Sequence, residues 1–124
     1  MVTKIKIIAG VIEIIGELDD TEIAKSVIEA LPFEEEGELW GDEIYFHIPV
    51  KVGMIEENST ELLQLGDIAY WPAGACFCIF FGKTPLSSEG EIRAAGPVNV
   101  IGRLTEEPQR LKGYMGGIVK VSLV

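Results

Sequence analysis

The stretch GDIAYWPAGACFCIFFGKTP, residues 66–85, carries no charged side chain between Ile68 and Gly82. Pro72 and Gly74 divide its apolar part into two pieces of strand length, and strands buried on both faces read as continuous apolar runs. Each piece is far shorter than the roughly 20 apolar residues that a membrane-spanning helix needs. We therefore predict two central strands of a sheet and no membrane element.

The remaining sequence adds further short strands on both sides of this pair. Two β-branched runs around Ala9–Gly10 predict a hairpin at the start of the chain. Residues 61–65 are compatible with a short strand or a turn, and residues 105–113 with a turn or a single helical turn. The other strand patterns lie at residues 43–52, 97–104 and 118–124.

A single helix is predicted near residues 20–31. Asp19 is the expected N-cap, Glu22 would complete a capping box, and Pro32 would end the helix. The glutamate run from Glu34 to Glu38 is interpreted as a solvated loop. Two further loops are predicted by composition, at residues 56–60 and 82–91.

These elements predict one mainly β domain over residues 1–124. Seven or eight short strands follow one another too closely for strand–helix–strand units. That spacing favours a closed antiparallel β-barrel of about eight strands with one short α-helix.

Composition and charge narrow the classes of partner. The formal net charge of −10 argues against nucleic acid, which requires clustered Lys and Arg. We find no targeting segment and expect a cytoplasmic protein. The chain is rich in Ile and Glu and poor in Asn and Gln, which favours a heat-adapted source.

The two cysteines are interpreted as small buried side chains. In a strand, the Cα atoms of Cys76 and Cys78 stand about 7 Å apart, too far for an unstrained disulfide. With a single histidine in the chain, cysteine and histidine alone cannot close a zinc site, so no metal or other cofactor is expected. Strand alternation places both thiols on one face, and Phe77, Ile79 and Phe81 on the other.

Three segments of the sequence resemble the small cyclophilin-like proteins of prokaryotes. They are WGDEIYFHIPV at 40–50, the stretch 66–85, and GPVNVIGRL at 96–104. The Trp-Pro-x-Gly turn at 71–74, followed by Cys-x-Phe-Phe-Gly-x-Thr-Pro at 78–85, is the most specific part of the resemblance. It implies the cyclophilin-type barrel and leaves the function open.

True cyclophilins are peptidyl-prolyl isomerases, and the resemblance lets their catalytic positions be compared one by one. The pocket glutamine matches Cys76, and the pocket phenylalanine matches Cys78. The catalytic arginine matches Ile48 or Phe46, depending on which neighbouring residue anchors the alignment. Neither alignment supplies a guanidinium group.

The family's pocket tryptophan falls near Leu86, and its neighbouring histidine near Glu91. Rotation about a prolyl bond has a barrier of about 20 kcal/mol, and a donor aimed at the twisted amide is the main device that lowers it. Without the arginine and the glutamine, isomerase activity is disfavoured.

By the same resemblance the phenylalanine face is core, and the cysteine face lines a partly solvated groove. Trp71 is either a plug at the rim or an amphipathic anchor for a ligand. His47 is more simply structural than catalytic. The carboxylates of Asp42 and Glu43 could face a cationic ligand, although a role at the start of a strand is simpler. The groove residues that we predict are His47, Tyr70, Trp71, Pro72, Cys76, Cys78 and Leu86.

The function that follows is binding without catalysis, or with weak catalysis, of a small molecule or a proline-containing peptide. The alternative is an enzyme: a weak prolyl isomerase, or an unrelated activity in the same groove. For such an activity the thiols are the best candidates. Their pKa is expected to be normal or raised, because the surface is acidic.

Overall fold

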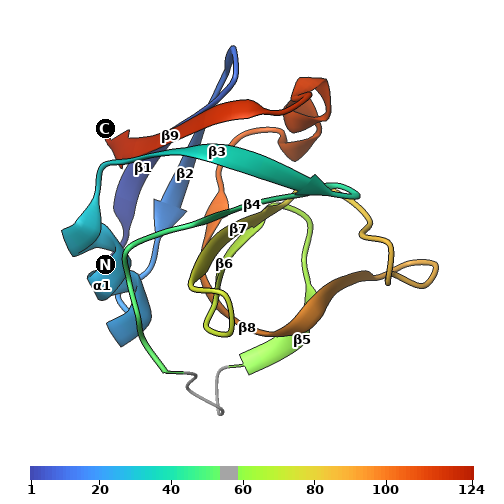
Figure 1. Cartoon of the computed structure of the whole chain (residues 1–124), viewed down its shortest axis with the longest axis horizontal. Helices are drawn as coiled ribbons and strands as arrows, with labels where there is room; N and C mark the ends of the chain where they lie inside the picture. The colour runs from blue at the N-terminus through green and yellow to red at the C-terminus, as the bar shows by residue number, and fades with distance from the viewer. Residues whose placement is uncertain (54–58) are drawn as a thin grey trace.

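The computed structural model describes residues 1–53 and 59–124, and its strands form one sheet that closes on itself (Figure 1). The strands are β1 (Thr3–Ala9), β2 (Ile12–Leu18), β3 (Phe33–Trp40), β4 (Glu43–His47), β5 (Ser59–Leu63), β6 (Asp67–Trp71), β7 (Cys76–Phe80), β8 (Ile92–Leu104) and β9 (Gly117–Leu123). The helices are α1 (Glu22–Ala30) and the 3₁₀ helix η2 (Pro108–Gly113).

Eight of the nine strands form a ring. Their order is β2-β1-β9-β3-β4-β7-β6-β8, and pairing of β8 with β2 closes the ring. All of these pairs are antiparallel. The ninth strand, β5, pairs with the first part of β8. The predicted closed, mainly β architecture of about eight strands is thus confirmed.

The interior of the ring is filled by side chains from alternate strand positions. In β1, for example, Ile5, Ile7 and Ala9 are fully buried, whereas the residues between them are partly exposed. Ile23, Ala24 and Val27 of α1 join the same cluster, which we call the inner core. Burial of this apolar surface is the main stabilising contribution to the fold.

The helix α1 lies where the sequence predicts it, but its cap is different. Thr21 is the N-cap, and its side chain accepts a hydrogen bond from the backbone N–H of Ala24. The predicted capping box from Asp19 to Glu22 is wrong. The reason is that Asp19 lies two residues too early, and its carboxylate instead accepts hydrogen bonds from the backbone and hydroxyl of Thr21. In the described part of the chain, neither helix is long and apolar enough to cross a bilayer.

The glutamate run is also different, because residues 34–38 lie within β3 and not in a loop. The ring needs a strand between β9 and β4, and a strand tolerates charge on its solvent face. Lys120 of β9 lies opposite Glu34, with 3.9 Å between Nζ and Oε1. At Gly37 a Cβ would lie 2.3 Å from the Tyr114 hydroxyl, so glycine is required for that tyrosine to pack.

Other boundaries shift by a few residues. Ser59 and Thr60, predicted as loop, begin β5, whereas residues 56–58 lie outside the described residues. The strand predicted at 97–104 begins five positions earlier, at Ile92. The predicted loop at 82–91 and the helical turn at 108–113 are confirmed.

Candidate functional site

The strand β7 separates the inner core from a second cluster on the outside of the ring. Phe77 and Ile79 point inward and are fully buried, together with Phe81 just beyond the strand. Cys76, Cys78 and Phe80 point outward and belong to the second cluster. The predicted assignment of faces is confirmed. The interpretation of both cysteines as small buried side chains is confirmed. The expectation that the cysteine face is partly solvated is wrong, because Cys76 is 7% and Cys78 only 1% exposed.

The outer face is buried because the first part of β8 separates from β6 and packs over it. The β6–β8 ladder ends at the pair Tyr70–Asn99. Beyond that point β8 pairs with β5, and its register jumps from Val98 to Arg93. Residues 94–97 are therefore left out of the ladder, and Pro97 among them has no N–H to contribute. This segment covers the outward side chains of β4, β6 and β7.

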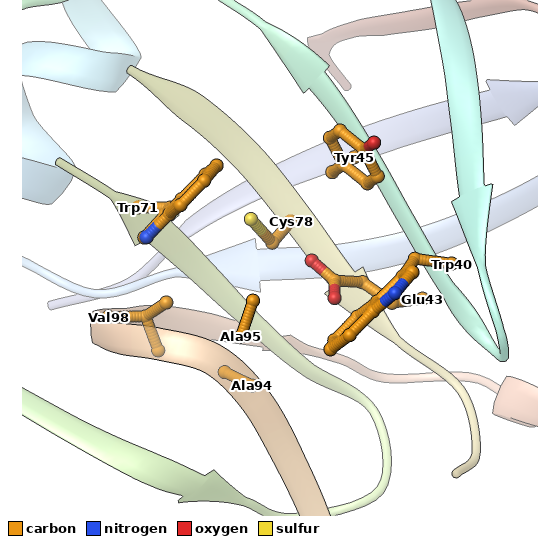
Figure 2. Close-up of a pocket in the computed structure, with 8 residues that line it drawn as sticks. All are labelled: Trp40, Glu43, Tyr45, Trp71, Cys78, Ala94, Ala95 and Val98. Atoms are coloured by element: carbon orange, nitrogen blue, oxygen red, sulfur yellow. The ribbon is translucent and has the colours of Figure 1, made fainter. Parts of the chain in front are cut away.

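A cavity of about 220 Å³ remains between this cover and the sheet, and we call it the outer cavity (Figure 2). Its floor and walls come from five strands, so residues far apart in the sequence meet there. They are Trp40 of β3, Glu43 and Tyr45 of β4, Trp71 of β6, Cys78 of β7, and Ala94, Ala95 and Val98 of β8.

Strand register explains why these side chains meet. Tyr45 of β4 lies opposite Cys78 of β7, and Glu43 lies opposite Phe80, so both β4 residues face outward. Trp40 pairs with Glu43 across the β3–β4 hairpin. The turn of that hairpin contains Gly41 at φ +60°, where other residues are strained. The hairpin thus places an indole next to a carboxylate.

Glu43 is a carboxylate in an apolar site. It is 6% exposed, and burial raises its pKa to about 7, although the Cys78 thiol partly offsets this by donating a hydrogen bond to it. Figure 2 shows the carboxylate directed toward Cys78, beside the ring of Trp40. None of the ion pairs among the described residues involves Glu43. The charged form therefore has no cation to offset the loss of solvation.

The other titratable groups of the outer cavity are held in their neutral forms. Burial raises the pKa of Cys78 well above its ordinary value, and the Glu43 carboxylate raises it further. Burial and then the charges of Glu38 and Glu43 raise the pKa of Tyr45. Burial and Glu43 also raise the pKa of the neighbouring Cys76. Neither thiol is activated as a nucleophile, because a thiolate requires a lowered pKa.

Trp71 packs closely against Gly74 and lies near Gly96. A Cβ on Gly74 would lie 2.7 Å from the Trp71 ring, so the indole packs directly against the backbone of the β6–β7 turn. A Cβ on Gly96 of β8 would lie 3.7 Å from its Nε1. The indole thus bridges the sheet and its cover, with one part of the ring facing the outer cavity.

The seven predicted groove residues do not share one pocket in the structure. Trp71 and Cys78 line the outer cavity, and Cys76 lies beside them in the outer cluster. His47, Tyr70 and Pro72 line a second, more open hollow of about 490 Å³. Leu86 is exposed and lines neither space. A role of any of the seven in ligand binding stays a prediction.

Two of the residues that line the second hollow have structural partners. His47 Nδ1 lies 3.2 Å from the carbonyl oxygen of Gly74. The hydroxyl of Tyr70 donates a hydrogen bond to the carbonyl of Val50 and accepts one from the backbone N–H of Val52. Both contacts tie β4 and the residues after it to the β6–β7 hairpin.

The comparisons with known proteins agree with this architecture. Residues 3–122 match the family described as cyclophilin-like. The chain belongs to the cyclophilin-like family. It is also similar to a hypothetical protein of Archaeoglobus fulgidus whose solution structure is known, with 40% sequence identity and a TM-score of 0.83. That match covers 99% of this chain and 95% of the other. Among curated proteins nothing matches.

In this cyclophilin-like chain the two positions that match the catalytic arginine are turned away from the outer cavity. Phe46 and Ile48 belong to the inner core and are almost fully buried. Side chains at these positions therefore point into the ring. In the part of the chain that the structure describes, no arginine or lysine lines the outer cavity.

The predicted groove residues do not include Trp40, Tyr45 or the residues of β8 that line the outer cavity. Glu43 was considered for a cationic ligand, but a role at the start of a strand was preferred. Strand alternation with the outward thiols was the signal that could have grouped Tyr45 and Glu43 with Cys78. The residues of β8 carried no such signal, because their position depends on where β8 separates from β6.

Proposed function

We propose that this cyclophilin-like protein binds a small organic molecule in the outer cavity. The observation that carries the proposal is a largely apolar, partly enclosed space with a single buried carboxylate in its wall. Ligand sites combine apolar and aromatic walls with a few placed polar groups in this way. Burying a polar group costs free energy, and buried titratable groups with shifted pKa values are concentrated at functional sites.

The size of the outer cavity favours a compact ligand. An apolar cavity of about 150 Å³ holds benzene, whereas sites for drug-sized molecules begin near 300 Å³. The outer cavity, at about 220 Å³, lies between them. A short metabolite or a fragment of one fits this volume better than a peptide segment with flanking residues.

Intrinsic fluorescence tests the proposal directly, because both tryptophans of the chain line the outer cavity. We expect a screen of small neutral, cationic and anionic compounds to yield members that raise the melting temperature and change the tryptophan emission together. The variant Ala95→Phe, which adds bulk at an exposed position of the lining without adding a tryptophan, should block both effects. Compounds that stabilise the protein without changing the emission would place the site elsewhere.

An enzymatic role is the second candidate, and one observation favours it. A carboxyl group with a pKa of about 7 is suited to general acid–base catalysis near neutral pH. Turnover of a bound compound that is lost in Glu43→Gln would support this role.

In a protease-coupled assay with prolyl peptides we expect only the background rate. A faster rate that disappears in Trp71→Ala would support an isomerase instead.

A further inference from the structure

We propose that the outer cavity selects a small organic cation, an ammonium group with alkyl substituents, and that Glu43 is its counter-ion. This inference rests on the proposed function and names the class of ligand. It is carried by two features of the same space: aromatic rings on several sides, and a buried carboxylate without a cationic partner among the described residues.

The aromatic rings come from three different strands. Trp40 lies at the end of β3, Tyr45 on β4 and Trp71 on β6, and all three line the cavity (Figure 2). A cation over the face of such a ring is attracted by its quadrupole, most strongly by tryptophan, and aromatic cages use this to bind quaternary ammonium groups. The small side chains of Ala94 and Ala95 opposite the sheet leave room for substituents on the nitrogen.

The carboxylate decides the sign of the ligand's charge. Glu43 is only 6% exposed and lies among hydrocarbon, two indoles and a thiol, so its ionised form has little access to water and no cationic partner in the described lining. An ammonium group would supply the missing charge. An anionic ligand would meet the carboxylate without a compensating Lys or Arg in the described lining. A neutral ligand would leave Glu43 as a buried acid.

Binding of a cation must then be linked to release of a proton. The groups that face Glu43 are Cys78 and, more weakly, Cys76 on β7 and Tyr45 on β4; β8 contributes no titratable side chain to the lining. Burial raises the pKa of all three of these groups, so they stay protonated at neutral pH. Only Glu43 in the lining therefore titrates between pH 5 and 8, and its pKa is about 7. Because the cation binds the ionised form, affinity should rise with pH and reach a plateau above pH 7.

The test is a fluorescence titration with choline and with 3,3-dimethyl-1-butanol, which has the same shape without the charge. At pH 8 we expect choline to bind at least about tenfold more tightly than the alcohol. Between pH 8 and pH 5 its affinity should fall by up to about 100-fold, since each pH unit below the pKa costs a factor of ten. The affinity of the alcohol should stay constant or rise slightly.

Two variants distinguish the effect of the Glu43 carboxylate on choline binding from the effect of the chain's net negative charge. Glu43→Gln should abolish the preference for choline and its pH dependence, while the alcohol still binds. Glu35→Gln removes the same charge from an exposed position of β3 and should change neither. If Glu43→Gln does not fold, the pH series of the unaltered protein still decides the matter.

Equal affinities for choline and the alcohol, or choline binding that is insensitive to pH, would overturn the cation assignment and leave the proposed function standing. Absence of any response to choline, tetramethylammonium and butylammonium would also overturn it. In that case the wider compound screen decides separately whether the outer cavity binds anything.

Discussion

The inner core and the outer cavity lie on opposite faces of the same strand, β7, and differ in how completely they are filled. On the inner face, Phe77 stacks on Phe46 with ring centroids 5.3 Å apart and meets Phe33 edge to face at 6.3 Å. On the outer face, Cys78 borders a space of about 220 Å³ that contains a carboxylate. The inner face of β7 is closely packed, whereas its outer face is incompletely packed.

This difference suggests a division of labour between the two faces. Dispersion and apolar burial are largest where interiors are close-packed, so the inner core carries the stability of the fold. A cavity and a buried carboxylate without a cationic partner among the described residues both reduce stability. Features that lower stability in folded proteins concentrate at functional sites, so their presence together on the outer face supports the proposed function.

Truncation of the inner face should have the largest effect. Phe77→Ala removes a fully buried ring that contacts two others, and should lower the free energy of unfolding by about 3–5 kcal/mol. Urea denaturation measures this loss, and Phe77→Leu should lose less. A loss below about 1 kcal/mol for Phe77→Ala would contradict the division of labour.

Neutralising Glu43 should have the next largest effect, and its size should depend on pH. Burial raises the pKa of Glu43 from its ordinary value of 4.5 to about 7, so the folded state holds this proton more tightly than the unfolded state. The associated stability is fully present below pH 4.5 and is lost as the pH rises to about 7. This shift corresponds to about 3 kcal/mol.

Glu43→Gln cannot ionise, so it should gain about 3 kcal/mol relative to the unaltered protein between pH 4 and pH 8. Denaturation curves at both pH values measure the gain, and Glu35→Gln serves as the control because that side chain is exposed. If the two proteins keep a constant difference in stability across this range, Glu43 is not buried as described.

Gly74→Ala, which adds a methyl group next to Trp71, should lower the free energy of unfolding less than the two preceding substitutions change it. It should weaken ligand binding in the outer cavity. Gly74→Ala places its Cβ 2.7 Å from the indole ring, which must shift away from the turn. Overpacking of this kind costs about 1–3 kcal/mol. We expect altered tryptophan emission and weaker ligand binding. Gly53→Ala meets no atom within 4 Å and is the matched control; equal effects of both substitutions would show that Trp71 is not held by Gly74.

Replacing the outward thiols should have the smallest effect. In Cys78→Ser the hydroxyl can take over the hydrogen bond to Glu43, so the cost should be about 1 kcal/mol, as for a modest change in one buried hydrogen bond. Cys76→Ser should cost less, because this residue is 7% exposed and its thiol lies 3.4 Å from the Gly74 carbonyl oxygen. Thermal unfolding measures both. Rapid alkylation of either cysteine in the folded protein at neutral pH would contradict the raised thiol pKa.

The faces of β7 could be predicted from the sequence because strand alternation is a local rule. Cys76 and Cys78 share one face, and Phe77 and Ile79 the other, whatever the strand packs against. The hairpin at the N-terminus and the helix before Pro32 follow from equally local signals. The loop predicted for the glutamate run at 34–38 is wrong, because composition alone favours a loop, whereas closing the ring requires a strand there.

The outer cavity could be predicted only in part. The presence of Trp71 and Cys78 in one pocket could be predicted from the stretch 66–85, which resembles the cyclophilin-like proteins. The same prediction is wrong for Leu86, which does not line the outer cavity. The cover over the site depends on the point where β8 leaves β6, at Asn99, and no local pattern marks that point. Burial of Glu43 follows from this cover, so its raised pKa was equally out of reach of the sequence.

The most direct measurement of the central claim is the position of a bound ligand, read by intermolecular nuclear Overhauser effects between its protons and assigned protein protons. The compound should be the one that changes the tryptophan emission most in the screen. We predict contacts to the indole protons of both Trp40 and Trp71 and to the methyl groups of Ala94 and Ala95. Contacts confined to His47 and Pro72 in the second hollow, with none to Trp40, would contradict the account.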